Sequence, residues 1–397
     1  MNRSHKIRLY PTKQQEKILE KSCSVARFAY NWGLERWKIL YQCGMKTSSF
    51  GVKSDFIQMK KSLFSWANEV GKSVYEESFN QVGVAFKNFF RGVKKGKKVG
   101  FPKFKKRGKC RDSFYVANDR IRFFDNRISI PKVGRVKMAE QPRFVGKLLK
   151  ATVSKRAGRW FVSLSYEIPE SEPKPVQSAV GLDLGVSKSV VCSDGKFYQT
   201  PSKIELYEKK LRRLHKSLSR KKKGSQRWKR AREKLSLFYY RLQCLRDDFI
   251  HKLTSKLTNE NQVVCVEDLG VSNMVRNRHL ARSIINQCFG RIVEFLQYKA
   301  QVLLKVPRFF PSTQLCPACG QKNKIPLSKR TYSCSCGYEQ DRDYNGSLNI
   351  ILKAIEDFKL ADKKALALLK DKVKLCLDEA RIRKIVLTEE LLCSSTF

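Results

Sequence analysis

Four cysteines between residues 316 and 336 constrain the fold of this chain more than any other feature. Cys316 and Cys319 form one pair, Cys334 and Cys336 form a second, and fourteen residues separate the pairs. Four thiolates with this spacing can converge on one tetrahedral Zn²⁺. Because the segment between them is polar, the bound metal would supply much of the free energy that folds it. The sequence therefore predicts a structural zinc ribbon.

The chain is also strongly basic. Its 397 residues include 82 Lys and Arg against 36 Asp and Glu, which gives a net charge of +46. A compact chain with this excess repels itself unless a polyanion neutralises it, so we expect a nucleic acid partner. A membrane surface is the alternative, but no apolar run reaches the roughly 18 residues of a spanning helix.

The N-terminal segment and the distribution of cysteines both indicate a reducing compartment. The N-terminal segment MNRSHKIRLYPT has no apolar signal core. Beyond the four clustered cysteines, the remaining nine of thirteen are scattered among apolar neighbours, which favours free buried thiols over disulfides. We therefore expect the protein to stay in the cytosol.

The first hundred residues predict one strand followed by helices. Residues 6–10 alternate as a strand does, and Thr12 with Gln15 forms a capping box that begins a helix. Helical patterning continues to about residue 90 and includes an apolar stripe for which we expect a core-facing side, made by Phe79, Val82 and Phe86. Beside this stripe, Asn80 and Gln81 carry side chains that suit adenine edges.

A β-rich section follows an abrupt change of composition at Gly92. Glycines and cations, among them Lys103, Lys105 and Lys106, indicate an exposed linker that tracks phosphates. Short strand patterns over 113–168 then suggest a small barrel or curled sheet, which the N-terminal strand joins. The run 169–176 contains three prolines and predicts a domain boundary.

Three carboxylates in the second half of the chain lie at or next to apolar segments, where charged side chains are unusual. Asp183 interrupts the otherwise apolar strand pattern of 179–186, and Glu267 ends the apolar strand 263–266. Asp343 lies just before a predicted helix over 345–353. Taken singly, Glu267 is typical of an ordinary strand end and Asp343 of a helix N-cap.

Together these carboxylates form a ligand set for divalent metal in an RNase H-like sheet. Nearby carboxylates on rigid elements repel one another unless cations lie between them. Two Mg²⁺ or Mn²⁺ ions would hold the scissile phosphate and stabilise the leaving oxygen. The donors are all oxygen, which favours Mg²⁺ or Mn²⁺ over Zn²⁺ at this second site.

A basic helical hairpin separates the two strands. Residues 209–234 contain fourteen Lys or Arg and one acid, and leucines at helical spacing predict two helices around 223–225. The alternative is that these charges form an ordinary solvent-exposed helix face. A run in which nearly all the charges are positive favours contact with phosphates instead. The cations that we select for this contact are Arg220, Lys221, Lys222, Lys223, Arg227, Lys229 and Arg230. After Glu267, the pattern of 283–304 predicts a further helix.

These motifs resemble the insertion-sequence-encoded TnpB proteins. The resemblance is carried by KIRLYPTKQQEKIL, GFPKFKKR, GLDLG, SRKKKGSQRWKRAREKL, VEDLGV, RFFPSTQLCPACG and CGYEQDRDYNGSLNI, and it covers most of residues 5–352. It implies an RNA-guided DNA endonuclease that uses a guide RNA from the transposon end and cuts double-stranded DNA beside a short motif. By motif match, Asp183, Glu267 and Asp343 would be the catalytic carboxylates.

The resemblance also implies a multi-domain α/β architecture. It assigns a wedge β-barrel to 1–10 and 101–170, a helical recognition insertion to 11–100, a linker to 171–177, a RuvC-like nuclease to 178–310 with the hairpin at 203–258, a zinc ribbon to 311–340, a last RuvC segment to 341–355 and a charged helical tail to 356–397. The second knuckle, Cys334-Ser335-Cys336, is one residue shorter than is usual in the family.

Three other functions stay open. A guide-RNA-dependent repressor that does not cut would be expected to have lost a catalytic carboxylate, and none is lost here. A transposase would use a similar acidic site, but no separate end-binding domain is apparent. A compact type V CRISPR effector is a close variant of the nuclease, and a neighbouring CRISPR array or transposon end would separate the two.

Overall fold

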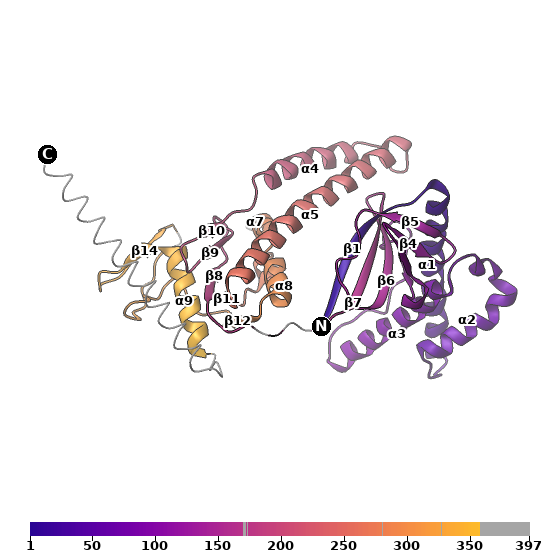
Figure 1. Ribbon diagram of the computed structural model, residues 1–397, viewed down its shortest axis with the longest axis horizontal. Coiled ribbons are helices and arrows are strands. Elements are labelled where there is room, and N and C mark those ends of the chain that lie inside the picture. Colours follow the sequence, from indigo (N-terminus) through magenta and orange to yellow (C-terminus); the bar gives the residue numbers. More distant parts are fainter. Residues whose placement is uncertain (170–171, 173, 280, 327, 358–397) are drawn as a thin grey trace. The chain divides into compact units, whose positions relative to one another are not determined.

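The computed structural model describes residues 1–169, 172, 174–279, 281–326 and 328–357. The chain divides into two compact units, the first ending at residue 171 and the second beginning at Glu172 (Figure 1). This division falls within the proline-rich run 169–176. Nearly all of the expected helical tail, from residue 358 on, lies outside the described residues. None of the helices in the described ranges has the length and apolar content needed to span a bilayer.

The first unit is a seven-stranded antiparallel sheet with helices inserted after its first strand. The sheet order is β2-β6-β7-β1-β5-β4-β3, so the first strand pairs with β7 on one side and β5 on the other. The elements are β1 (Asn2–Tyr10), α1 (Lys13–Gln42), α2 (Ser49–Leu63), η1 (Ser65–Glu69), α3 (Lys72–Lys94), β2 (Ser113–Val116), η2 (Asn118–Arg120), β3 (Arg122–Phe124), β4 (Arg127–Ile130), β5 (Gly134–Met138), β6 (Lys147–Arg156) and β7 (Arg159–Glu167).

The inserted helices follow the local signals of the sequence. The capping box at Thr12 and Gln15 is present at the start of α1. Phe79, Val82 and Phe86 on α3 are buried, so the stripe is a core-facing side, as we expected. Phe86 stacks on Trp37 of α1 with the ring centroids 4.6 Å apart. Helices and sheet thus share one core.

The second unit contains a mixed sheet of order β10-β9-β8-β11-β12 and a short ribbon. β8, β11 and β12 are parallel, whereas β9 and β10 are antiparallel to their neighbours. The elements are β8 (Ala179–Asp183), β9 (Val190–Cys192), β10 (Phe197–Tyr198), α4 (Lys203–Ser219), α5 (Gln226–Glu260), β11 (Val263–Glu267), α6 (Val271–Met274), α7 (Ala281–Gln287), α8 (Phe289–Lys299), β12 (Val302–Val306), β13 (Thr331–Ser333), β14 (Glu339–Asp341) and α9 (Arg342–Asp357).

Alternate residues of the parallel strands serve two different cores. Even-numbered residues such as Leu182 and Val266 pack with α5 and α8. Odd-numbered residues such as Val263 and Cys265 pack with α9, whose Ile350 and Ile351 complete that core. Because side chains alternate along a strand, any odd-numbered residue of β8 or β11 points towards α9.

The prediction of one helix over 283–304 is wrong. The structure has α7 and α8 with a break at Cys288, whose φ is 56°, and residues 302–306 form strand β12 beside β11. Short apolar runs fit a helix or a buried strand equally well by pattern. Here the pairing of Val302–Val306 with β11 decides for the strand.

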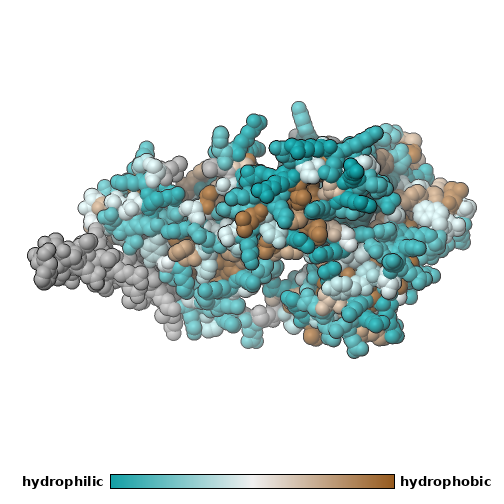
Figure 2. Space-filling view, turned by 90° about the horizontal axis from the view of Figure 1, so that it is seen from above, coloured by the Kyte–Doolittle hydropathy of each residue, from teal (hydrophilic) through white to brown (hydrophobic). Residues whose placement is uncertain are grey.

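The basic hairpin consists of α4 and α5. Ile204 and Leu211 of α4 pack against Leu235, Phe238 and Leu242 of α5 in a core of their own. The cations therefore lie on the outside of the hairpin. Figure 2 views the protein from above Figure 1, and hydrophilic side chains cover most of that face.

Candidate metal centres and nucleic-acid interface

Asp183 and Glu267 end two neighbouring parallel strands. β8 and β11 pair with Leu182 opposite Val266, so the residues that follow lie at the same edge of the sheet. Both are odd-numbered residues and therefore point to the face that α9 covers. Asp183 is buried, with 9% of its surface exposed.

The third carboxylate, Asp343, comes from the first turn of α9. Two glycines allow this helix to lie directly on β8. A Cβ at Gly181 would stand 2.2 Å from the carbonyl oxygen of Ser347, and a Cβ at Gly346 would stand 3.1 Å from Asp183 Oδ2. The absence of these side chains is thus what permits Asp183 and α9 to approach each other.

Asp341, and not Asp343, caps this helix. Its Oδ1 accepts the backbone N–H groups of Asp343 at 3.0 Å and of Tyr344 at 3.1 Å. Its Oδ2 accepts from Lys188 at 3.0 Å. Burial raises the pKa of Asp341, but Lys188 and the two amides outweigh burial and hold the pKa below its usual value. The carboxylate of Asp343 is therefore not needed as the helix cap.

The carboxylates disturb one another electrostatically. Burial, together with the charges of Glu267 and Asp343, raises the pKa of Asp183 well above its ordinary value. Burial also raises the pKa of Glu267. Arg330 and Arg342 stand 3.8 and 3.9 Å from the oxygens of Asp343, and the charge of Arg342 also acts against the rise in the pKa of Asp183. A bound cation would relieve the repulsion that remains at Asp183.

Sequence reasoning missed the polar segment that links Glu267 to α9. The hydroxyl of Ser312 donates to Glu267 Oε1 and acts against the rise in the pKa of that carboxyl. From α9, Asn349 Nδ2 donates to the carbonyl of Ser312 at 2.8 Å and to that of Leu315 at 2.8 Å, and Asn345 Nδ2 also donates to Leu315 at 2.9 Å. The two asparagines spaced by four residues on a helix were the available signal.

The carboxylate donors fit hard divalent cations. All three offer oxygen, the donor that Mg²⁺ and Mn²⁺ prefer. Among the described residues, the four cysteines gather their ligand atoms within 4.8 Å of one another, whereas the three carboxylates are not among the groups gathered closely enough to hold one ion.

The four cysteines have the geometry of a zinc site. Cys316 Sγ lies 3.6 Å from Cys336 Sγ, and Cys319 Sγ lies 3.5 Å from Cys334 Sγ. A tetrahedron with Zn–S bonds of about 2.3 Å has sulfur atoms about 3.8 Å apart. A backbone hydrogen bond from Cys336 lowers the pKa of the Cys334 thiol to about 6, whereas burial raises that of Cys316 to about 12, so a bound Zn²⁺ would have to stabilise the thiolate of Cys316. The shortened knuckle therefore still brings both of its thiols to the group.

The hairpin cations are placed at its tip and on the first turns of α5. Six are exposed, namely Arg220, Lys222, Lys223, Arg227, Lys229 and Arg230. Lys221 differs, because its Nζ donates to the carbonyl and hydroxyl of Ser217, both at 2.9 Å. The sequence could not separate Lys221 from its neighbours.

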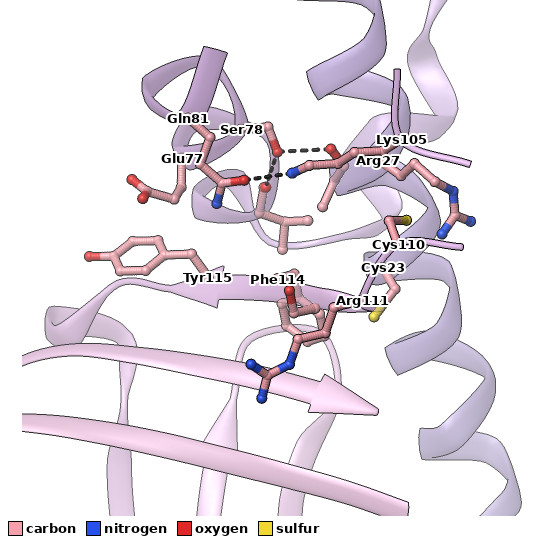
Figure 3. Close-up of a pocket in the computed structure, with 13 residues that line it drawn as sticks. Cys23, Arg27, Glu77, Ser78, Gln81, Lys105, Cys110, Arg111, Phe114 and Tyr115 are labelled. Atoms are coloured by element: carbon pink, nitrogen blue, oxygen red, sulfur yellow. Dashed lines mark hydrogen bonds between the residues drawn. The ribbon is translucent and has the colours of Figure 1, made fainter. Parts of the chain in front are cut away.

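The residues selected in the first unit fall into two groups. Lys103 and Lys106 are exposed, whereas Lys105 is half-buried and burial lowers its pKa. Lys105 Nζ donates to Gln81 Oε1 at 2.7 Å beside a small pocket between α1, α3 and β2 (Figure 3). The contact fixes the Gln81 amide with its oxygen as the acceptor, and within the described part of the chain its NH₂ group has no hydrogen-bond partner. Asn80 is exposed, but its Nδ2 donates to Glu77 at 3.0 Å.

Three family models match the chain. The model described as "Probable transposase" matches residues 163–278, and the one described as "Cas12f1-like, TNB domain" matches 289–350. A model described as "Helix-turn-helix domain" matches residues 1–46, which in this structure form strand β1 and the single long helix α1.

Relatives match over nearly the whole chain. A "Putative RNA-guided DNA endonuclease" of Streptomyces pristinaespiralis is 31% identical over 88% of this chain and 89% of its own. "Putative RNA-guided DNA endonuclease InsQ" of Escherichia coli is 30% identical over 87% and 90%. Among solved structures, a Cas12f1–sgRNA–target DNA complex has a TM-score of 0.55 at 12% identity, and it covers 88% of this chain and 98% of that one. The structural likeness concerns the fold alone.

Proposed function

Because this chain belongs to the TnpB family, we propose that it is an RNA-guided DNA endonuclease of a transposable element, with Asp183, Glu267 and Asp343 as its catalytic carboxylates. One observation carries the assignment of these residues. Two parallel strands and one helix, from segments up to 160 residues apart, direct three carboxylates to one face of a sheet, and burial together with the charges of the other two raises the pKa of Asp183. Such an arrangement destabilises the protein unless it binds cations.

The three carboxylates would hold two Mg²⁺ or Mn²⁺ ions. When bound, these ions supply Lewis-acid stabilisation of the charge that develops on the phosphate and the leaving oxygen. The protein itself holds these carboxylates in place. Lys188 and the α9 amides fix Asp341, so the first turn of the helix presents Asp343. Ser312 fixes one oxygen of Glu267.

Nucleic acid binding is assigned to two surfaces, one on each unit. The exposed cations of the α4–α5 hairpin, together with Lys103 and Lys106, would contact phosphates, because exposed Lys and Arg neutralise the backbone without reading sequence. Gln81 would contact a base of the motif beside the target, since its NH₂ group is free while Lys105 occupies its oxygen. Asn80 would contact a base only after its hydrogen bond to Glu77 breaks.

The finer architecture is proposed on the same family membership. We assign a RuvC-type nuclease to the second unit, interrupted by a ribbon in which Cys316, Cys319, Cys334 and Cys336 hold a structural Zn²⁺. We assign a wedge barrel with a helical recognition insertion to the first unit. The guide RNA would derive from the transposon end.

The test is to express the protein with its native flanking DNA and sequence the RNA that copurifies. The complex is then incubated with Mg²⁺ and a plasmid library that carries the matched target beside randomised flanks. Guide-matched cleavage beside one flanking motif, lost in Asp183→Ala with nucleic-acid binding retained, is the expected result. Cleavage by a clean preparation of Asp183→Ala would overturn the carboxylate assignment.

The other outcomes separate the alternatives. A discrete bound RNA with target binding but no cleavage would indicate a repressor. Absence of any discrete RNA would favour the transposase. A guide RNA encoded by an adjacent CRISPR array would indicate a type V effector.

A further inference from the structure

A tight turn after β12 lies beside the carboxylate site. Val306, the last residue of β12, pairs with Glu267, and its carbonyl accepts the backbone N–H of Asp268 at 3.0 Å. The chain then turns over residues 307–310, where the N–H of Phe310 donates to the carbonyl of Pro307 at 3.0 Å. The turn therefore begins directly opposite one of the proposed catalytic residues.

Residues on both sides of the tip of this turn are held in place. Arg308 Nη2 lies 2.7 Å from Asp268 Oδ2, and its Nε donates to the Asp268 carbonyl at 3.0 Å. Phe310 packs against the core under α9. Ser312 donates to Glu267. The backbone on both sides of Phe309 is thus anchored to the nuclease sheet.

The side chain of Phe309 projects into solvent. Its exposed fraction is 91%, compared with the partial burial of the next residue, Phe310. An exposed aromatic ring contributes no hydrophobic stabilisation to the fold, because none of its apolar surface is removed from solvent. A flat partner that covers the ring would gain that contribution on binding.

Resting on the proposed function, we propose that Phe309 stacks on an unpaired base of the DNA strand that is cut. A base offers a flat face of the right size, and stacking of this kind tolerates any sequence, as an enzyme whose specificity lies in a guide requires. Arg308, whose side chain is 44% exposed, stands next to the ring and can meet the neighbouring phosphate. Phe309 is a positioning residue, not a catalytic one.

The chain keeps the exposed ring close to the carboxylates. Phe309 stands three positions before Ser312, whose hydroxyl donates to Glu267, so the Cα atoms of Phe309 and Ser312 are at most about 10 Å apart. The stacked base is therefore expected close to the scissile phosphate.

The test compares Phe309→Ala, Phe309→Leu and Phe309→Trp in the full-length complex with its guide RNA. Leucine keeps apolar volume without a ring, and tryptophan keeps a ring. Single-turnover cleavage should fall about tenfold or more for Ala and Leu, the effect of losing one stacked base, and stay within about threefold for Trp. Phe50→Ala, at a phenylalanine of α2 that is 75% exposed, is the matched control and should cleave like the wild type.

A second readout does not depend on cleavage. In an Asp183→Asn background, 2-aminopurine is placed at successive positions of each DNA strand near the cut. Quenching at one or two positions that disappears with Phe309→Ala is expected. Unchanged quenching, or full activity of Phe309→Leu, would overturn the proposal. Failure of the wild-type complex to cut would overturn the proposed nuclease function instead, and the fluorescence comparison would still test the stacking.

Discussion

The replacement Gly346→Ala tests how closely α9 must approach Asp183. The added Cβ would stand 3.1 Å from Asp183 Oδ2 and 3.1 Å from Thr313 Cγ2, whereas ordinary contacts begin at 3.4 Å. The difference, 3.4 minus 3.1, requires the carboxylate or the helix to yield by about 0.3 Å. The substitution thus displaces one proposed metal ligand without altering its chemistry.

The expected effects on stability and on activity differ. Alanine in a helix interior is favoured over glycine by about 1 kcal/mol, and mild overpacking costs about 1 kcal/mol or slightly more. The free energy of unfolding should therefore change by less than about 1 kcal/mol. A misplacement of 1 Å in an active site costs about 100-fold in rate, so 0.3 Å corresponds to about fourfold if the cost scales with distance.

Two assays and one control separate these effects. Urea unfolding followed by circular dichroism measures stability, and single-turnover cleavage by the guide RNA complex measures rate. Gly290→Ala on α8 is the control, because no atom lies within 4 Å of its added Cβ. It should be as stable as the wild type or more stable, with an unchanged rate. If Gly346→Ala also cleaves at the wild-type rate, Asp183 is not held as the structure indicates.

Three further predictions concern charge and metal. Asp183→Asn should raise the stability of protein free of Mg²⁺ at pH 7.5, since the raised pKa of the wild-type carboxyl makes its ionised form unfavourable in the fold. The gain should shrink as the pH falls and vanish below about pH 3, where the carboxyl is protonated in both the folded and the unfolded state, and a gain independent of pH would contradict this. Replacing Arg220, Lys221, Lys222 and Lys223 by Ala should reduce the slope of log affinity for DNA against log salt concentration by about 2.7, which is about 0.9 for each of three phosphates. Lys221 is not counted, because its Nζ is already bonded to Ser217. An unchanged slope would show that these cations only face solvent. Cys336→Ser should release zinc, measured by metal analysis, and lower the unfolding midpoint, while retention of one zinc per chain would rule out this thiol as a ligand.

The sequence predicted those features that a local pattern carries. The thiols at 316, 319, 334 and 336 gather as their spacing indicated. Two apolar strands, each with one carboxylate, are visible because a charge in a buried run is unusual. The capping box of α1 depends on two residues three positions apart, and it is present.

Features that depend on packing could not be predicted. The strand at Val302–Val306 was taken for helix because only its pairing with β11 distinguishes the two. The role of Asp341 as the cap follows from where β14 ends, two residues before Asp343. Gly181 matters because of Ser347, which lies far along the chain, and no local pattern links the two residues.

The central place of β1 in the seven-stranded sheet has a consequence for synthesis. Asn2 pairs with Glu167, and Leu9 pairs with both Met138 and Trp160. At about 5 to 20 residues per second, the ribosome takes roughly 8 to 30 seconds to deliver these partners. The helices between them form from local contacts long before. The first strand therefore has no partner until β5 emerges, and its longer edge stays open until β7, the last strand of the sheet, emerges.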